Sequence, residues 1–156
     1  MSPPLRRIEL LIESQLDNIP LLAASVNHIC NYVGMNEMQR FEVELCTVEA
    51  VTNAVVHAYG GEAGHRVCVD VEAGPEELRI CIRDRGRPMP AEARQVPQEL
   101  EVDPEDIENL PERGRGLFLI HRLMDEVEVS SDATGNQLVL VKRLRRVEPA
   151  GTDISR

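Results

Sequence analysis

The chain has 156 residues, of which 42% are hydrophobic and 3% aromatic, and its formal net charge is −10 at pH 7. This length fits one domain with a sizeable core, and that core must be built mainly from aliphatic side chains. The acidic balance argues against direct nucleic-acid binding, which requires a basic face. We interpret the basic cluster KRLRR, residues 142–146, as the solvated end of a strand.

No apolar run is long enough to span a membrane, and the start of the chain lacks the pattern of a signal peptide, so a cytoplasmic location is expected. The four cysteines lie singly within apolar patterns, with no C-x-x-C pair. We interpret them as small hydrophobes rather than as zinc ligands or disulfide partners.

Hydrophobic periodicity gives the expected elements in chain order. Alternating apolar residues predict strands over 6–13, 66–73, 77–83, 125–130 and 137–144. Helical spacing predicts helices over about 19–33, 37–59 and 114–124, with Asp17 or Asn18 capping the first and Asn36 the second. The order βααββαββ predicts an α/β (α+β) two-layer sandwich, in which a mixed, mostly antiparallel five-stranded sheet carries three helices on one face. One domain is expected over residues 1–146, with 147–156 as a tail.

The long helix includes ELCTVEAVTNAVVHAY, residues 44–59. Glu49 and Asn53 are four residues apart and therefore lie one above the other, with His57 one turn further along. A carboxylate and an amide at this position suit an oxygen-ligated metal and a positioned nucleophile. A polar helix margin without a chemical role is the alternative. The pair is expected to border the stripe that packs on the sheet, formed by Phe41, Leu45, Val48, Thr52, Val55 and Tyr59.

Residues 87–113 hold five of the ten prolines, with eight acidic residues against three arginines. A loop of this length inside a domain is usually a lid, a binding loop or a disordered segment, and residues 103–106 resemble a brief helical start. Asp84-x-Gly86 precedes it at a strand end, where a buried aspartate can accept a hydrogen bond from an exocyclic amine such as that of adenine.

The segment is followed by Gly114-x-Gly116-Leu117, which is expected to open a helix. A glycine pair at that place lets backbone amides approach a phosphate, and the helix N-terminus favours its negative charge. Arg113 and Arg115 are candidate counter-charges. The chain has no P-loop, Rossmann fingerprint, H-E-x-x-H or G-x-S-x-G motif.

The stretches EAVTNAVVHAY, RDRGRP and ERGRGLFLI together resemble the nucleotide-binding boxes of the histidine kinase-like ATPases. Within that superfamily the chain is most similar to the stand-alone anti-sigma-factor serine/threonine kinases of bacteria, over residues 6–144. The resemblance implies the Bergerat fold, with ATP and Mg²⁺ as cofactors. It implies an anti-sigma factor that phosphorylates an antagonist protein and sequesters a sigma factor. It also implies a homodimer, which we expect to form near the N-terminal strand.

The same resemblance implies roles for individual residues. Asn53 ligates Mg²⁺, and Glu49 orients the accepting hydroxyl or acts as a base. Asp84 reads adenine, while Gly86 admits its ring. Residues at about 87–113 form a lid over the nucleotide. The implied phosphate and nucleotide contacts beneath this lid comprise Arg113, Gly114, Arg115, Gly116 and Leu117.

The chain departs from the superfamily pattern at two places. Arg87-Pro88 follows D-x-G where many members have a further glycine, a version that also occurs in the anti-sigma branch. Gly135-Asn136 stands where Gly-Thr is common, which leaves open the polar contact that the threonine would make.

Two alternative functions stay open. Beside an active kinase, the chain could be an ATP-binding anti-sigma module with little or no phosphotransfer, or another histidine kinase-like ATPase. A histidine kinase needs a helical phosphoacceptor hairpin, for which the residues before the long helix are too few.

Overall fold

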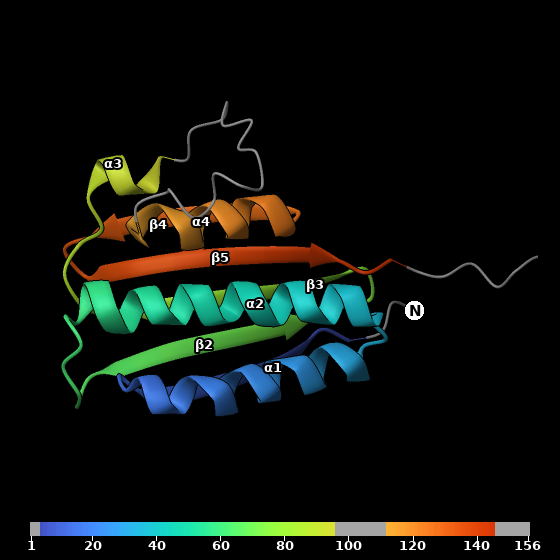
Figure 1. The fold of residues 1–156 in the computed structure, drawn as a ribbon. Helices are drawn as coiled ribbons and strands as arrows, with labels where there is room; N and C mark the ends of the chain where they lie inside the picture. The colour runs from blue at the N-terminus through green and yellow to red at the C-terminus, as the bar shows by residue number, and fades with distance from the viewer. Residues whose placement is uncertain (1–3, 96–111, 146–156) are drawn as a thin grey trace, which may run out of the picture.

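The computed structural model describes residues 4–95 and 112–145 (Figure 1). The strands are β1 (Arg6–Glu13), β2 (Arg66–Ala73), β3 (Glu77–Asp84), β4 (Glu126–Asp132) and β5 (Gly135–Arg143). The α-helices are α1 (Ile19–Tyr32), α2 (Glu37–Asn53), the short α3 (Ala91–Arg94) and α4 (Glu112–Leu123). A 3₁₀ turn, η1 (Leu16–Asn18), precedes α1, and a π-helical turn, η2 (Ala54–Ala58), continues α2.

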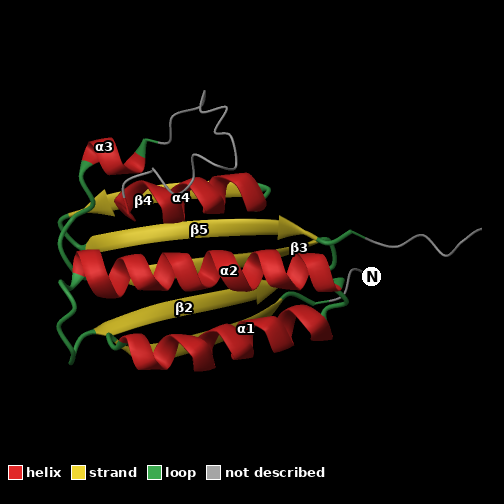
Figure 2. Cartoon of the chain, viewed as in Figure 1, coloured by secondary structure: helices red, strands yellow, loops and turns green. Residues whose placement is uncertain are grey.

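The five strands form one sheet in the order β1-β2-β3-β5-β4, and α1, α2 and α4 cover one of its faces (Figure 2). The predicted sandwich and its element order are therefore confirmed, as is the edge position of β1. All four described pairings are antiparallel, so the expected mixed pairing is wrong. Two helices between β1 and β2 return the chain to the end where β1 stops. The strand β4, which runs parallel to β3, is separated from it by β5.

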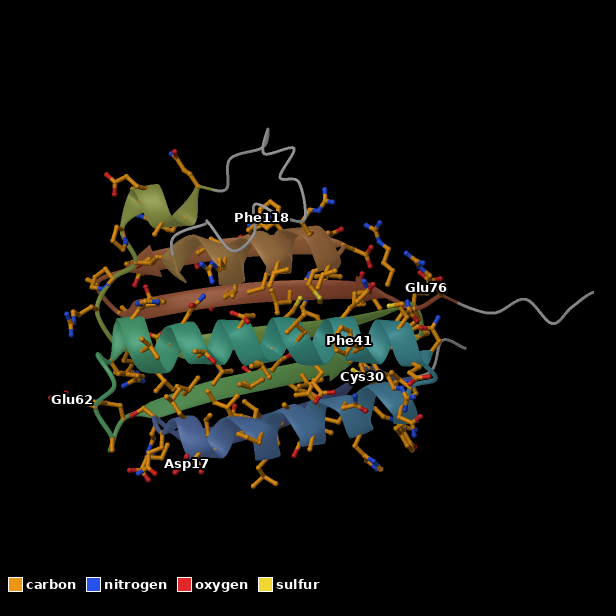
Figure 3. All side chains as sticks on the ribbon, viewed as in Figure 1. Asp17, Cys30, Phe41, Glu62, Glu76 and Phe118 are labelled. Atoms are coloured by element: carbon orange, nitrogen blue, oxygen red, sulfur yellow. The ribbon has the colours of Figure 1, made fainter. Side chains whose placement is uncertain are left out.

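The central helix α2 lies between α1 and α4 (Figure 1). Its N-cap is confirmed, because the Asn36 side chain accepts a hydrogen bond from the Gln39 amide at 2.8 Å. The predicted packing stripe is correct at Val55 and Tyr59, which are buried, but wrong at Phe41, which is 58% exposed on the outer side of the helix (Figure 3). The buried apolar residues of α2 are instead mostly small or branched: Val43, Cys46, Ala50 and Val51.

Lys142 contradicts the expectation of a solvated strand end. Its side chain is only 4% exposed, and its Nζ lies 2.5 Å from Glu42 Oε2 and donates to the Leu123 carbonyl at 2.5 Å. An ammonium group is favourable at a helix C-terminus, and here it also joins β5 to α2 and α4. Lys142 therefore belongs to the packing between the layers.

Residues 96–111, including the expected helical start at 103–106, and the tail at 147–156 lie outside the described residues. Within the described part of the chain, no helix is long and apolar enough to cross a membrane.

Candidate functional site

A buried carboxylate ends β3. Asp84 is 9% exposed, and its Oδ1 accepts hydrogen bonds from the Gly86 amide at 2.9 Å and from Asn136 Nδ2 at 2.8 Å. Burial raises the pKa of this carboxyl group, while the two hydrogen bonds oppose the rise. No described residue donates to Oδ2, so this oxygen is left to accept a hydrogen bond from a ligand.

Gly86 allows the chain leaving β3 to approach the end of α2. A Cβ at this residue would lie 2.4 Å from the Ala58 carbonyl oxygen, which also accepts a hydrogen bond from the Arg87 amide at 2.8 Å. Ala58 ends the π-helical turn, an irregularity that is frequent at functional sites. Any side chain at residue 86 would therefore collide with backbone atoms of Ala58, so this position requires glycine.

A cavity of about 220 Å³ adjoins Asp84. Its walls come from the end of α2 with η2, from β3, β4 and β5, from α4, and from the described segment that follows β3. Few polar groups converge on it, among them Asp84, Asn53 and His57, and most of the remaining lining is apolar, including Ala54, Ile82, Met89, Leu117 and Leu138. An apolar pocket with a few placed polar groups is typical of a small-molecule site.

Glu49 and Asn53 lie together on α2, as the four-residue spacing predicted, and α4 packs directly on them. A Cβ at Gly116 would lie 2.8 Å from Glu49 Oε2 and 3.4 Å from Asn53 Nδ2. The fold therefore brings the two motifs into contact, with Asn53 also lining the cavity beside Asp84.

The glycine pair does not open α4 as expected, because the helix begins at Glu112. Only the first four amides of a helix lack an intrahelical acceptor, a group that includes Gly114 but not Gly116. Arg115 is half-buried on α4 and Leu117 lines the cavity, whereas the side chain of Arg113 lies outside the described ones. The phosphate-binding roles of these residues stay predictions.

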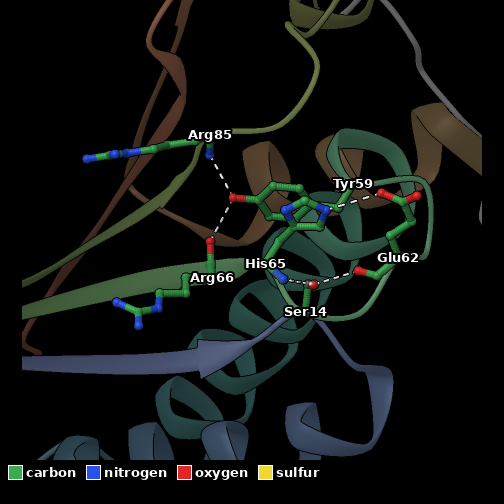
Figure 4. Close-up of polar contacts among 6 residues, drawn as sticks. All are labelled: Ser14, Tyr59, Glu62, His65, Arg66 and Arg85. Atoms are coloured by element: carbon green, nitrogen blue, oxygen red, sulfur yellow. Dashed lines mark hydrogen bonds and ion pairs between the residues drawn. The ribbon is translucent and has the colours of Figure 1, made fainter.

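Tyr59, which helical spacing predicts to pack on the sheet, also makes polar contacts beside the site. Its ring stacks on His65 with centroids 4.5 Å apart (Figure 4). Its hydroxyl donates to the Arg66 carbonyl at 2.7 Å and accepts from the Arg85 amide at 2.8 Å. A buried tyrosine hydroxyl needs hydrogen-bond partners, and this need is the one sequence signal that could have indicated a polar role for Tyr59. Tyr59 thereby fixes the backbone directly after Asp84.

The comparisons with known proteins agree with this geometry. The family model of the histidine kinase-like ATPase domain matches residues 12–142. The serine-protein kinase RsbW of Listeria innocua is 28% identical over 155 residues, with 96% of each chain covered. The protein of the same name from Bacillus mycoides is 27% identical, with 99% of this chain and 97% of that protein covered.

Solved structures show the same fold at low identity. The RsbU and RsbW domains of a Mycobacterium tuberculosis protein match with a TM-score of 0.65 and 17% identity, covering 90% of this chain and 33% of that one. The blue-light activated histidine kinase of Erythrobacter litoralis matches with a TM-score of 0.55 and 20% identity, covering 82% of this chain and 41% of that one.

Proposed function

This chain belongs to the histidine kinase-like ATPase domain family, and we propose that it is a cytoplasmic anti-sigma factor with serine/threonine protein kinase activity. It phosphorylates an antagonist protein at the expense of ATP and sequesters a sigma factor. Its near full-length similarity to serine-protein kinases named RsbW supports this choice within the family. The structural observation that carries it is the contact of Gly116 with Glu49 and Asn53 beside the Asp84 cavity.

The cavity fits an adenine base. Asp84 Oδ2, left without a described donor, is an acceptor for the exocyclic amine, and the apolar lining of Ile82, Leu117 and Leu138 suits the faces of the ring. A carboxylate that only accepts hydrogen bonds does not suit guanine, which presents a carbonyl oxygen at the same position. The cavity therefore favours ATP over GTP.

The donor set beside the cavity fits the phosphates and Mg²⁺. The Asn53 side chain offers the amide oxygen that a hard cation prefers, and the N-terminal turn of α4, with Gly114 and Arg115, offers positive charge to an anion. Mg²⁺, when bound, neutralises the charge that develops on the transferred phosphoryl group. Glu49 accepts the proton of the acceptor serine or threonine hydroxyl and holds that hydroxyl in line.

Exchange of Glu49 for glutamine tests the kinase proposal against a module that only binds ATP. Glu49→Gln keeps the size of the side chain but removes the base, so phosphotransfer to the antagonist should fall by roughly 10²–10⁴-fold while ATP affinity and sigma-factor binding persist. Single-turnover assays and calorimetry measure the two effects. Glu37→Gln, an exposed change in the first turn of the same helix, is the matched control. Unchanged phosphotransfer in Glu49→Gln would leave Glu49 as a polar helix margin.

The proposal includes a homodimer formed through β1. This strand lies at the sheet edge, where its backbone groups are open to pairing, and it carries the exposed apolar side chains Ile8 and Leu11. A two-fold axis beside the strand would pair it with its own copy. Ile8 and Leu11 lie on opposite faces of the strand, so the paired strand would shield part of one residue on each face.

A further inference from the structure

The Asn136 side chain uses all of its hydrogen-bonding capacity. Its Nδ2 donates to Asp84 Oδ1 and to the Arg87 carbonyl, both at 2.8 Å. Its Oδ1 accepts from the Met89 amide at 2.9 Å and from Ser131 Oγ at 2.7 Å. The partners fix the orientation of the amide, because two of them only accept and the Met89 amide only donates.

This side chain sits at a position set by strand pairing. Asn136 lies opposite Asp84 in the register of β3 with β5, so its amide reaches the carboxylate and the chain that leaves β3. It occupies the place at which the sequence departs from the common Gly-Thr. Since a threonine has a single hydroxyl, it cannot match the four contacts that the amide makes.

The segment at residues 85–89, which we call the wall segment, is held along its backbone. Pro88 has no amide hydrogen, and each of the other four amides has a fixed acceptor. The acceptors, in chain order, are Tyr59 Oη, Asp84 Oδ1, the Ala58 carbonyl and Asn136 Oδ1, with Ser131 Oγ as a second acceptor for the last. Arg87, Pro88 and Met89 all line the cavity. Residues 87–89, expected to start a lid, are therefore part of its fixed wall.

The hydrogen bonds that Asp84 accepts from the protein determine which of its oxygens a ligand can use. The donors from Asn136 and Gly86 occupy Asp84 Oδ1, which leaves Oδ2 as the acceptor available to a ligand. A carboxyl group without these donors is free to turn, or to take up a proton and donate to a carbonyl oxygen. We propose that Asn136 is a positioning residue for base specificity, which holds Asp84 and the wall segment so that the cavity accepts only a purine with an exocyclic 6-amine. This inference rests on the proposed use of ATP.

The experiment compares three variants with the wild-type chain. Asn136→Ala removes every contact of the amide, and Asn136→Thr keeps one hydroxyl donor for Asp84 but not the full set. Ser131→Ala is the matched control for base preference, because it removes the hydrogen bond to Asn136 Oδ1 and the second acceptor of the Met89 amide but leaves both donors of Nδ2 in place. Calorimetry gives the Kd for ATP, for GTP and for purine riboside triphosphate, which lacks the 6-amine. Hydrogen exchange of the Met89 amide, measured without nucleotide, reports on the wall segment.

In Asn136→Ala we expect the preference for ATP over the 6-unsubstituted analogue to fall about tenfold or more, the loss of one hydrogen bond to a charged group. Met89 exchange should rise in the same variant. Asn136→Thr should keep most of the preference while Met89 exchange rises, and Ser131→Ala should keep the preference. Equal weakening of all three nucleotides in Asn136→Ala, with the preference unchanged, would overturn the inference alone. A wild-type chain that binds no nucleotide would overturn the proposed function as well.

Discussion

Gly116 of α4 lies so close to Glu49 of α2 that a Cβ at residue 116 would come within 2.8 Å of Glu49 Oε2. The obstructing atom is the end of a flexible side chain, so an added methyl group can displace it without moving the backbone. The close contact therefore matters for the position of the carboxylate rather than for the packing of the two helices.

Gly116→Ala should separate stability from activity. Alanine favours the helical state over glycine by up to about 1 kcal/mol, so the free energy of unfolding should stay constant or rise. Phosphotransfer should fall, because the methyl group pushes the Glu49 carboxylate out of place. Urea unfolding and single-turnover phosphotransfer measure the two effects. Gly74→Ala, whose Cβ would be 3.4 Å from the Glu77 carbonyl in the β2–β3 turn, should leave phosphotransfer unchanged. Full activity in Gly116→Ala would show that the contact does not position Glu49.

Gly86→Ala, unlike Gly116→Ala, should lower stability as well as function. The new Cβ would meet the Ala58 carbonyl oxygen at 2.4 Å, and backbone atoms cannot move aside as a side chain does. Overpacking of this kind typically costs about 1–3 kcal/mol, so the urea midpoint should drop. The shift should also deform the cavity and weaken ATP binding in calorimetry. A variant as stable as the wild-type chain would mean that the backbone of η2 can shift at Ala58 with little loss of stability.

Local patterns predicted the elements of the fold well. The bounds of β1 and β2 follow from alternation along each strand, and the Asn36 cap follows from a hydrogen bond three residues away. The Glu49–Asn53 pair was equally accessible, since helical spacing alone places both side chains on one side of α2. These features depend on residues close together in the chain.

Contacts between distant residues could not be predicted in the same way. The ion pair of the buried Lys142 with the partly exposed Glu42 joins residues 100 positions apart. The outward position of Phe41 follows from α1 and α4 flanking α2, because helical spacing alone does not decide which side of a central helix meets the sheet. The bond from Asn136 to Asp84 needs the register of β3 with β5, which no motif records.

The dimer prediction concerns the exposed edge of β1. Leu11 is 54% exposed on this strand, and a charge on an edge strand opposes pairing with another chain. Sedimentation at micromolar concentration should find a dimer for the wild-type chain and a monomer for Leu11→Lys. Leu21→Lys, at a residue of α1 that is 73% exposed, is the control and should remain a dimer. A monomeric wild-type chain would refute the proposed assembly.

Asp84→Asn should change which base the cavity binds. The amide side chain introduced by this change would keep an oxygen for the donors of Gly86 and Asn136, and would turn its NH₂ group toward the cavity in place of Asp84 Oδ2. ATP affinity should fall about tenfold or more, because a donor now faces the adenine amine, while the affinity for GTP rises relative to that for ATP. Calorimetry with both nucleotides measures the change. Equal affinities of the wild-type chain for ATP and GTP would remove Asp84 from base recognition.

The same variant should be more stable than the wild-type chain at neutral pH. Burial raises the pKa of Asp84 above its ordinary value of 3.8, so the folded state disfavours the ionised carboxylate. The stability that the protonated group contributes is present below that ordinary value and is lost as the pH rises through the raised pKa. The amide of the variant does not ionise and carries no such loss. The gain in the free energy of unfolding of Asp84→Asn should therefore be largest at neutral pH and shrink toward acid pH, as urea unfolding across a pH series would measure. A gain that grew toward acid pH would mean that the hydrogen bonds to Oδ1 outweigh burial and lower the pKa of Asp84.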